Sequence, residues 1–201
     1  MNAKEYTYLA LGDSYTIGES VLANENFPNQ TTALLRKKGY NFLSPEIIAK
    51  TGWTTDELQS AVNNYHPKNN YDLVTLLIGV NNQFRGRNIN EYEKEFESLL
   101  KQAIQFAGND TNHLIVLSIP DWGATPFACG RDRLQITKDI DEFNAVNKKI
   151  SSKYNVHYID ITPWTKEASG NFSLITDDGL HPSGKEYKRW AEKISEIFTP
   201  Q

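Results

Sequence analysis

The sequence predicts an α/β protein, folded as a three-layer α/β/α sandwich around a five-stranded parallel sheet. Short apolar runs without a clean alternation are typical of strands covered on both faces, and segments with helical periodicity lie between them. Because strands and helices alternate along the chain, right-handed crossovers within one parallel sheet are favoured. The chain has 201 residues, of which 39% are hydrophobic, so we expect residues 1–201 to form a single domain.

The individual elements follow from the apolar runs and from signals at helix ends. The expected strands are residues 6–11, 46–49, 73–78, 114–119 and 156–161, and the expected helices are about 29–38, 56–65, 90–106, 138–154 and 183–198. Thr54 and Glu57 are spaced as a capping box for the second helix, and Gly39 follows the basic last turn of the first. Segments 120–135 and 162–180 lack clear periodicity, and loops of that length in a compact domain are usually functional.

Composition argues against several classes of partner. The net charge is -4, the sequence pI is about 5.6 and the basic residues are scattered, so we expect no nucleic-acid partner. No apolar run approaches the ~20 residues of a membrane span, so we expect no membrane-spanning segment. Cys129 is the only cysteine, which rules out an intramolecular disulfide and suits a reducing compartment. We expect a cytoplasmic protein, or a secreted or periplasmic one if a leader is removed from a precursor.

A candidate nucleophile follows the first expected strand. Residues 12–18 are Gly-Asp-Ser-Tyr-Thr-Ile-Gly, which places Ser14 at the carboxyl end of a strand, where open α/β sheets hold their sites. A serine hydroxyl needs a base within hydrogen-bond reach and a third group that orients the base. The segment 178–183, Asp-Gly-Leu-His-Pro-Ser, offers His181 and Asp178, with Asp177 as the alternative acid. Taken alone, Ser14 also fits an ordinary turn residue.

Two more segments end strands near Ser14. The third strand runs into Gly-Val-Asn-Asn at 79–82, where the Asn81 amide can donate to a developing oxyanion. The second strand leads to Gly52, whose missing side chain lets its backbone N–H approach the same oxygen. With the Ser14 N–H these donors form an oxyanion hole, and losing one such donor typically costs ~2.7–4 kcal/mol of transition-state stabilisation.

The order Ser14, Gly52, Asn81 and His181, with the motifs around them, resembles that of the SGNH (GDSL-type) hydrolases over nearly the whole chain. The resemblance implies a flavodoxin-like fold and serine-dependent ester hydrolysis with no metal or organic cofactor. It implies that Ser14 is the nucleophile, His181 the base and Asp178 the orienting acid. The oxyanion donors it implies are the N–H groups of Ser14 and Gly52 and the side chain of Asn81.

The chain departs from the family pattern at two positions. Tyr15 stands where Leu or Ile is usual, so we expect it either to face away from the chemistry or to form part of the pocket wall. Asn82 replaces the Asp that usually ends the middle motif, so a supporting carboxylate has become an amide. Asp13 is expected to fix the turn at Ser14 by accepting backbone N–H bonds.

The expected partner is a small-molecule ester, and the sequence defines its identity less closely than it defines the catalytic residues. No long apolar lid is evident, so we expect short acyl esters, including acetylated sugars, with lysophospholipid or thioester hydrolysis left open. Loops 83–88, 120–135 and 162–180 should border the site, and they carry four arginines that fit either an anionic substrate group or solvated surface charge: Arg85, Arg87, Arg131 and Arg133. The alternatives are a catalytically inactive carbohydrate-binding module of the same fold and a flavodoxin-like electron carrier. The carrier leaves Asn81, Asp178 and His181 unexplained.

Overall fold

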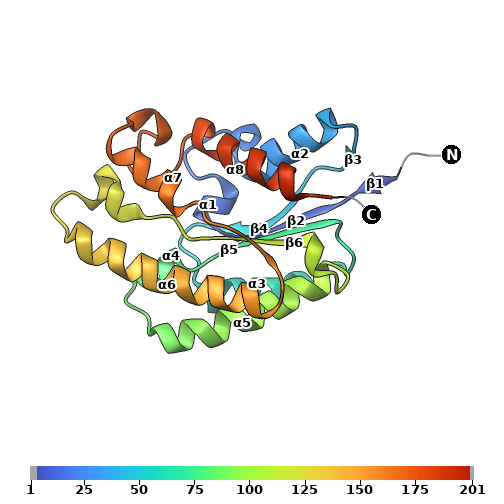
Figure 1. Cartoon of the computed structure of the whole chain (residues 1–201), viewed down its shortest axis with the longest axis horizontal. Coiled ribbons are helices and arrows are strands. Elements are labelled where there is room, and N and C mark those ends of the chain that lie inside the picture. Colours follow the sequence, from blue (N-terminus) through green and yellow to red (C-terminus); the bar gives the residue numbers. More distant parts are fainter. Residues whose placement is uncertain (1–3, 200–201) are drawn as a thin grey trace.

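A computed structural model describes residues 4–199, which form a parallel sheet between two layers of helices (Figure 1). The five strands are β2 (Tyr8–Asp13), β4 (Glu46–Lys50), β5 (Leu73–Leu77), β6 (Leu114–Leu117) and β7 (His157–Ile159). Their order is β4-β2-β5-β6-β7 and every neighbouring pair is parallel. The predicted α/β fold with a five-stranded parallel sheet is confirmed, in the strand order of flavodoxin-like proteins.

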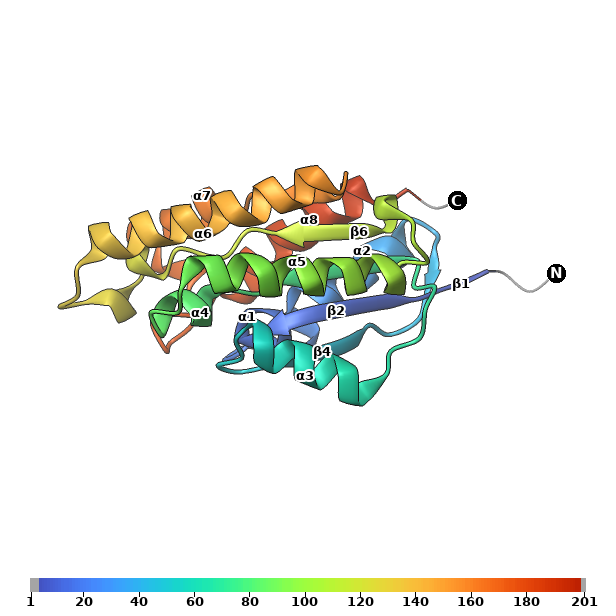
Figure 2. The same ribbon diagram turned by 90° about the horizontal axis from the view of Figure 1, so that it is seen from below.

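The helices bury one apolar face each against the sheet. Helices α2 (Phe27–Lys37) and α8 (Gly184–Ile197) cover one side, and α3 (Thr55–Tyr65), α5 (Ile89–Phe106) and α6 (Arg133–Lys153) cover the other. Seen from below, α5 lies between α3 and α6 (Figure 2). All six residues of β2 are buried, as are all five of β5, which agrees with apolar runs that do not alternate.

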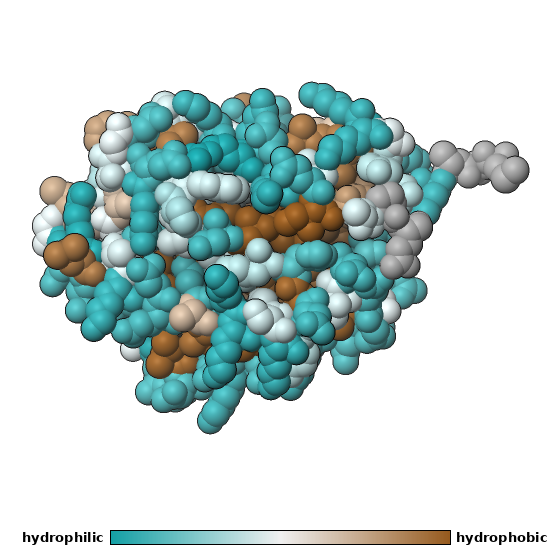
Figure 3. All heavy atoms as spheres, viewed as in Figure 1, coloured by the Kyte–Doolittle hydropathy of each residue, from teal (hydrophilic) through white to brown (hydrophobic). Residues whose placement is uncertain are grey.

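In the view of Figure 1, the surface of the protein is largely hydrophilic, with a band of hydrophobic atoms between the two helix layers (Figure 3). Within residues 4–199, no helix has both the length and the apolar character needed to cross a bilayer.

Several predicted boundaries were wrong. The strand expected over 6–11 is interrupted at Thr7, whose N–H donates to Asp72 Oδ2 at 2.8 Å. The residues before this break form β1 (Glu5–Tyr6), which pairs with β3 (Asn41–Phe42) in a separate two-stranded sheet that we did not predict. The capping box at Thr54 and Glu57 is confirmed.

The two segments expected to be irregular are partly helical. Helix α6 begins at Arg133, five residues before the expected 138, because Asp132 caps it by accepting from Gln135 N at 3.1 Å. The 162–180 segment contains α7 (Thr162–Lys166) and two short 3₁₀ turns, Glu167–Ser169 and Phe172–Leu174. The remaining short helices are α1 (Ser14–Ile17) and α4 (Val80–Phe84), with 3₁₀ turns at Ala23–Glu25, Thr111–His113, Trp122–Ala124 and Pro126–Ala128.

Candidate active site

Ser14 is the first residue of α1 and directly follows β2, at the carboxyl edge of the sheet. Asp13 caps this short helix, since its Oδ1 accepts from Tyr15 N at 3.0 Å, as predicted. Gly12 permits the sharp turn, because a Cβ there would lie 2.1 Å from Thr16 Oγ1 and 2.5 Å from the Leu77 carbonyl oxygen. The close packing of α1 on the strand therefore holds the Ser14 hydroxyl in a fixed place.

The loop before α8 brings His181 and Asp178 to Ser14. His181 Nε2 lies 3.0 Å from Ser14 Oγ, and His181 Nδ1 lies 2.7 Å from Asp178 Oδ2. Ser14 and His181 are 4% and 7% exposed, so their hydrogen bond is shielded from water. The acid in contact with the imidazole is Asp178 and not its neighbour Asp177. The arrangement lets an imidazole take a hydroxyl proton while a carboxylate fixes its orientation.

Asp178 is held as a carboxylate by several donors. Partial burial alone would raise its pKa, but hydrogen bonds from His181, Ser20 and Leu180 hold the pKa of Asp178 well below its usual range. Ser20 Oγ donates to Oδ2 at 2.7 Å, and Thr176 Oγ1 donates to Oδ1 at 2.8 Å. Ser20 and Thr176 were not predicted from the sequence, because neither lies in a recognisable motif. Only the folded chain brings Ser20 to the loop that carries Asp178.

The Gly52 turn lies next to Ser14 through the pairing of β2 with β4, in which Asp13 is opposite Lys50. Trp53 N donates to the Lys50 carbonyl at 3.2 Å, and Gly52 has a φ of 85°. These are the features of a type II turn, which requires a glycine at its third position. Gly52 is thus explained by the backbone, although it is not among the residues that line the catalytic cavity.

Asn81 approaches Ser14 from the start of α4. Its Nδ2 donates to the Trp53 carbonyl at 3.0 Å and to Asp13 Oδ2 at 3.3 Å. These bonds fix the amide with its nitrogen toward the two loops that carry Ser14 and Gly52. Asn81, Ser14 and His181 line one cavity of about 150 Å³.

Comparison with known proteins assigns the chain to a family. Residues 10–189 match the model of the GDSL-like lipase/acylhydrolase family. The chain belongs to this family. It is therefore a carboxylic ester hydrolase of the GDSL type, as the motifs predicted.

Solved structures support the fold of this GDSL hydrolase. A lipase from a goat rumen metagenome has a TM-score of 0.75 at 20% identity, with 96% of this chain and 97% of that one covered. A G-D-S-L lipolytic protein from Veillonella parvula has a TM-score of 0.71 at 20% identity, with 96% of this chain and 97% of that one covered. An acetylxylan esterase from Geobacillus stearothermophilus has a TM-score of 0.70 at 16% identity, with 98% of this chain and 95% of that one covered. A search of curated protein sequences returned no match.

Asn82 has a different task from Asn81 in the hydrolase. Its Oδ1 accepts from Thr55 N at 3.1 Å, and its Nδ2 donates to Thr55 Oγ1 at 2.7 Å, so it anchors the start of α3. The single hydroxyl hydrogen of Thr55 goes to Glu95. Because Thr55 Oγ1 then has only lone pairs to offer, an amide donor fits this position and the usual Asp would not.

Tyr15 forms part of the pocket wall, which was one of its two expected roles. Tyr15 is 3% exposed, and the centroid of its ring lies 5.0 Å from that of the His181 ring. Tyr15 also lines a second, apolar cavity of about 10 Å³ behind the first, and Trp122 and Leu180 border both cavities. These three side chains therefore divide the catalytic cavity from the inner one.

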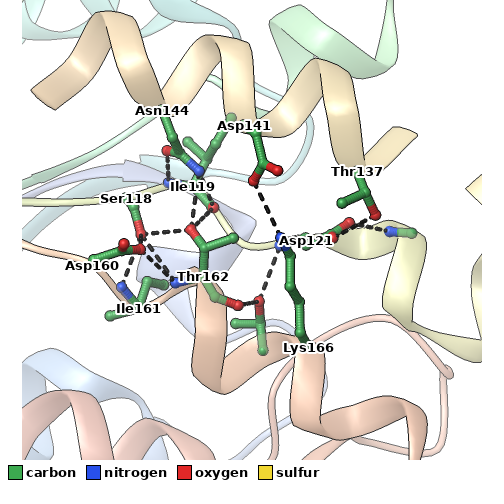
Figure 4. Close-up of polar contacts among 12 residues, drawn as sticks. Ser118, Ile119, Asp121, Thr137, Asp141, Asn144, Asp160, Ile161, Thr162 and Lys166 are labelled. Carbon is green, nitrogen blue, oxygen red and sulfur yellow. Dashed lines mark hydrogen bonds and ion pairs between the residues drawn. The ribbon is translucent and has the colours of Figure 1, made fainter. Parts of the chain in front are cut away.

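The loop that carries Trp122 is held by a polar network beside α6 and α7 (Figure 4). Asp121 is buried, accepts from Thr137 Oγ1 at 2.7 Å and caps the Trp122–Ala124 turn. Lys166 lies between Asp121 and Asp141, at 3.8 Å and 3.2 Å. Trp122 Nε1 in turn donates to Gln83 Oε1 at 2.8 Å. The network fixes one wall of the cavity on rigid helices.

The Asp13 carboxyl is fully buried between the nucleophile turn and Asn81. Burial raises its pKa to about 7, against the opposing effect of the hydrogen bonds from Tyr15 and Asn81. Within residues 4–199, no cluster of three or more His, Cys, Asp or Glu side chains is placed to hold a metal ion.

Proposed function

We propose that this chain is a serine esterase that cleaves small carboxylic esters through an acyl-enzyme. The observation that carries the proposal is the continuous chain of hydrogen bonds from Asp178 through His181 to Ser14 Oγ, which ends in a cavity with Asn81. A binding module or an electron carrier would have no use for a buried hydroxyl joined to an oriented base.

The proposed mechanism assigns one role to each group. His181 Nε2 takes the Ser14 proton as Oγ attacks the ester carbonyl carbon, and the resulting oxyanion is bound by the Ser14 N–H, the Gly52 N–H and Asn81 Nδ2. Of the two hydrogen bonds that Asn81 Nδ2 makes, the longer one, to Asp13, is the one that the oxyanion would replace. The protonated His181 then gives its proton to the leaving alcohol.

Water completes the cycle. His181 removes a proton from a water molecule as its oxygen attacks the acyl carbon, and the same proton returns to Ser14 Oγ as the acid leaves. Throughout both halves Asp178 stays ionised, because its low pKa keeps it charged, and it stabilises the imidazolium that forms twice.

The size of the cavity favours short acyl groups. Its volume of about 150 Å³ is well below the ~300–1,000 Å³ of pockets that enclose drug-sized ligands, and Tyr15 and Trp122 close its inner end. Acetylated carbohydrates fit this limit, since the sugar can remain outside the cavity, and one similar structure is that of an acetylxylan esterase. A long lysophospholipid acyl chain does not fit the cavity in this form.

The test is the hydrolysis of p-nitrophenyl acetate and its longer homologues by the wild type and Ser14→Ala. A matched control is Ser151→Ala in α6, because the Ser151 hydroxyl is buried and has no hydrogen-bond partner in the described part of the chain. We expect activity on short esters in the wild type and in the control, and none in Ser14→Ala. Equal rates in Ser14→Ala, or no hydrolysis by the wild type, would favour the binding-module alternative.

A further inference from the structure

Arg131 lies among three aromatic rings at the rim of the catalytic cavity, and these rings are inclined to one another by 41° to 67°. Its guanidinium carbon is 5.3 Å from the ring centroids of Phe84, Trp122 and Phe127 alike. The same three rings line the cavity together with Ser14 and His181, and Phe84 and Phe127 are partly open to solvent, at 46% and 39% exposure. The aromatic faces attract the cation and hold it beside the opening.

The other three arginines of these loops already have partners. Arg85 pairs with Glu57 at 3.3 Å and donates to the Gly52 carbonyl at 2.6 Å. Arg87 pairs with Asp56 at 3.7 Å, and Arg133 donates to the Thr125 carbonyl at 3.2 Å. Arg131 differs, because no carboxylate or carbonyl of residues 4–199 lies within bonding distance of its guanidinium. Its hydrogen-bonding edge is therefore free for a ligand.

We propose that Arg131 binds an anionic group on the alcohol part of the ester, so that the preferred substrates carry a carboxylate, sulfate or phosphate there. A guanidinium is planar, with its N–H groups in that plane, which suits two parallel hydrogen bonds to a carboxylate or a similar oxyanion. This inference deepens the proposed esterase function and rests on it.

The alcohol side is indicated by the position of these three rings relative to His181. In the proposed mechanism His181 protonates the leaving alcohol, which must then lie next to the imidazole. Phe127 N donates to the Gly179 carbonyl at 2.9 Å, so the turn whose Phe127 ring contacts Arg131 is tied to the loop that carries His181. A charge on the leaving alcohol is thus brought toward Arg131.

The test compares two acetate esters that differ in the charge of the alcohol: 4-acetoxybenzoate and its neutral methyl ester. The readout is the ratio of kcat/KM for the anionic ester to that for the neutral one, in the wild type, in Arg131→Gln and in the control Arg87→Gln. We expect Arg131→Gln to lower this ratio about tenfold, mainly by raising KM for the anionic ester. Arg87→Gln should leave the ratio unchanged. The wild-type ratio should also fall as salt is raised, because the site is partly exposed.

Two results would overturn the inference. If Arg131→Gln slows both esters equally, Arg131 only supports the aromatic wall. If the variant instead reduces the preference for monophenyl succinate over phenyl butyrate, where the charge is on the acyl side, the assignment to the alcohol is wrong. A wild type that hydrolyses none of these esters would count against the esterase function itself, and not against Arg131 alone.

Discussion

Tyr15 sets the depth of the catalytic cavity, and its removal should shift the enzyme toward longer acyl chains. Its side chain is almost fully buried between the catalytic cavity of about 150 Å³ and the inner cavity of about 10 Å³. Tyr15→Ala should merge the two spaces and add the volume of the phenol ring. Each methylene of substrate that enters this apolar space should gain about 0.8 kcal/mol, or about fourfold in kcat/KM.

The assay is kcat/KM for p-nitrophenyl esters from acetate to octanoate. For two additional methylenes the ratio of longer to shorter ester should rise about 16-fold in Tyr15→Ala relative to the wild type. The control is Tyr15→Phe, which keeps the ring in the pocket wall and removes only its hydroxyl, and it should keep the wild-type chain-length profile. The mutation should also cost about 3–5 kcal/mol of stability, which thermal unfolding would detect. An unchanged profile in a folded Tyr15→Ala protein would refute the role of Tyr15 as the end of the pocket.

Three further predictions concern the groups around Ser14. Asn81→Ala should lower kcat by about 10²–10³ with a small change in KM, and steady-state kinetics that show a loss mainly in KM would contradict an oxyanion role. Asp13 keeps its proton in the folded state up to about pH 7 but loses it near 3.8 when unfolded, so the free energy of unfolding should fall by about 4 kcal/mol between these pH values. Urea denaturation of the wild type and of Asp13→Asn at several pH values should show this fall in the free energy of unfolding only in the wild type. The same pH dependence in both proteins would exclude Asp13 as its cause. Asn82→Asp should destabilise the protein by about 1–3 kcal/mol, because a carboxylate would face the lone pairs of Thr55 Oγ1, and a variant as stable as the wild type would disprove that explanation.

The sequence was sufficient for those parts of the fold that depend on local pattern. Buried parallel strands have apolar runs, so the order of strands and helices and the position of Ser14 after β2 could be predicted. The start of α6 could not be predicted, because its first three residues, 133–135, are exposed and the helix begins at the Asp132 cap and not at an apolar residue. The separate pairing of β1 with β3 also depends on a contact between segments distant in sequence, the bond from Thr7 to Asp72.

The same distinction applies to the site. Ser14, Gly52, Asn81, Asp178 and His181 each lie in a motif, and the structure brings Ser14, Asn81 and His181 to one cavity with Asp178 behind the imidazole. The residues that hold these side chains in place or lie beside them could not be predicted from a motif. Ser20 reaches Asp178 only through the packing of two loops, and the free guanidinium of Arg131 is distinguished from the three paired arginines only by its surroundings in space.

If the proposed mechanism operates, Ser14 is acylated during turnover, and mass spectrometry of the acid-quenched enzyme detects that acyl group directly. The protein is mixed with excess p-nitrophenyl acetate, quenched within the first turnovers and digested. We predict one acetyl group on the peptide that contains Ser14, and none when the Ser14→Ala variant is treated in the same way. Turnover by the wild type with no acetylated peptide at any quench time, or with the acetyl group on another residue, would contradict the role of Ser14 as the nucleophile.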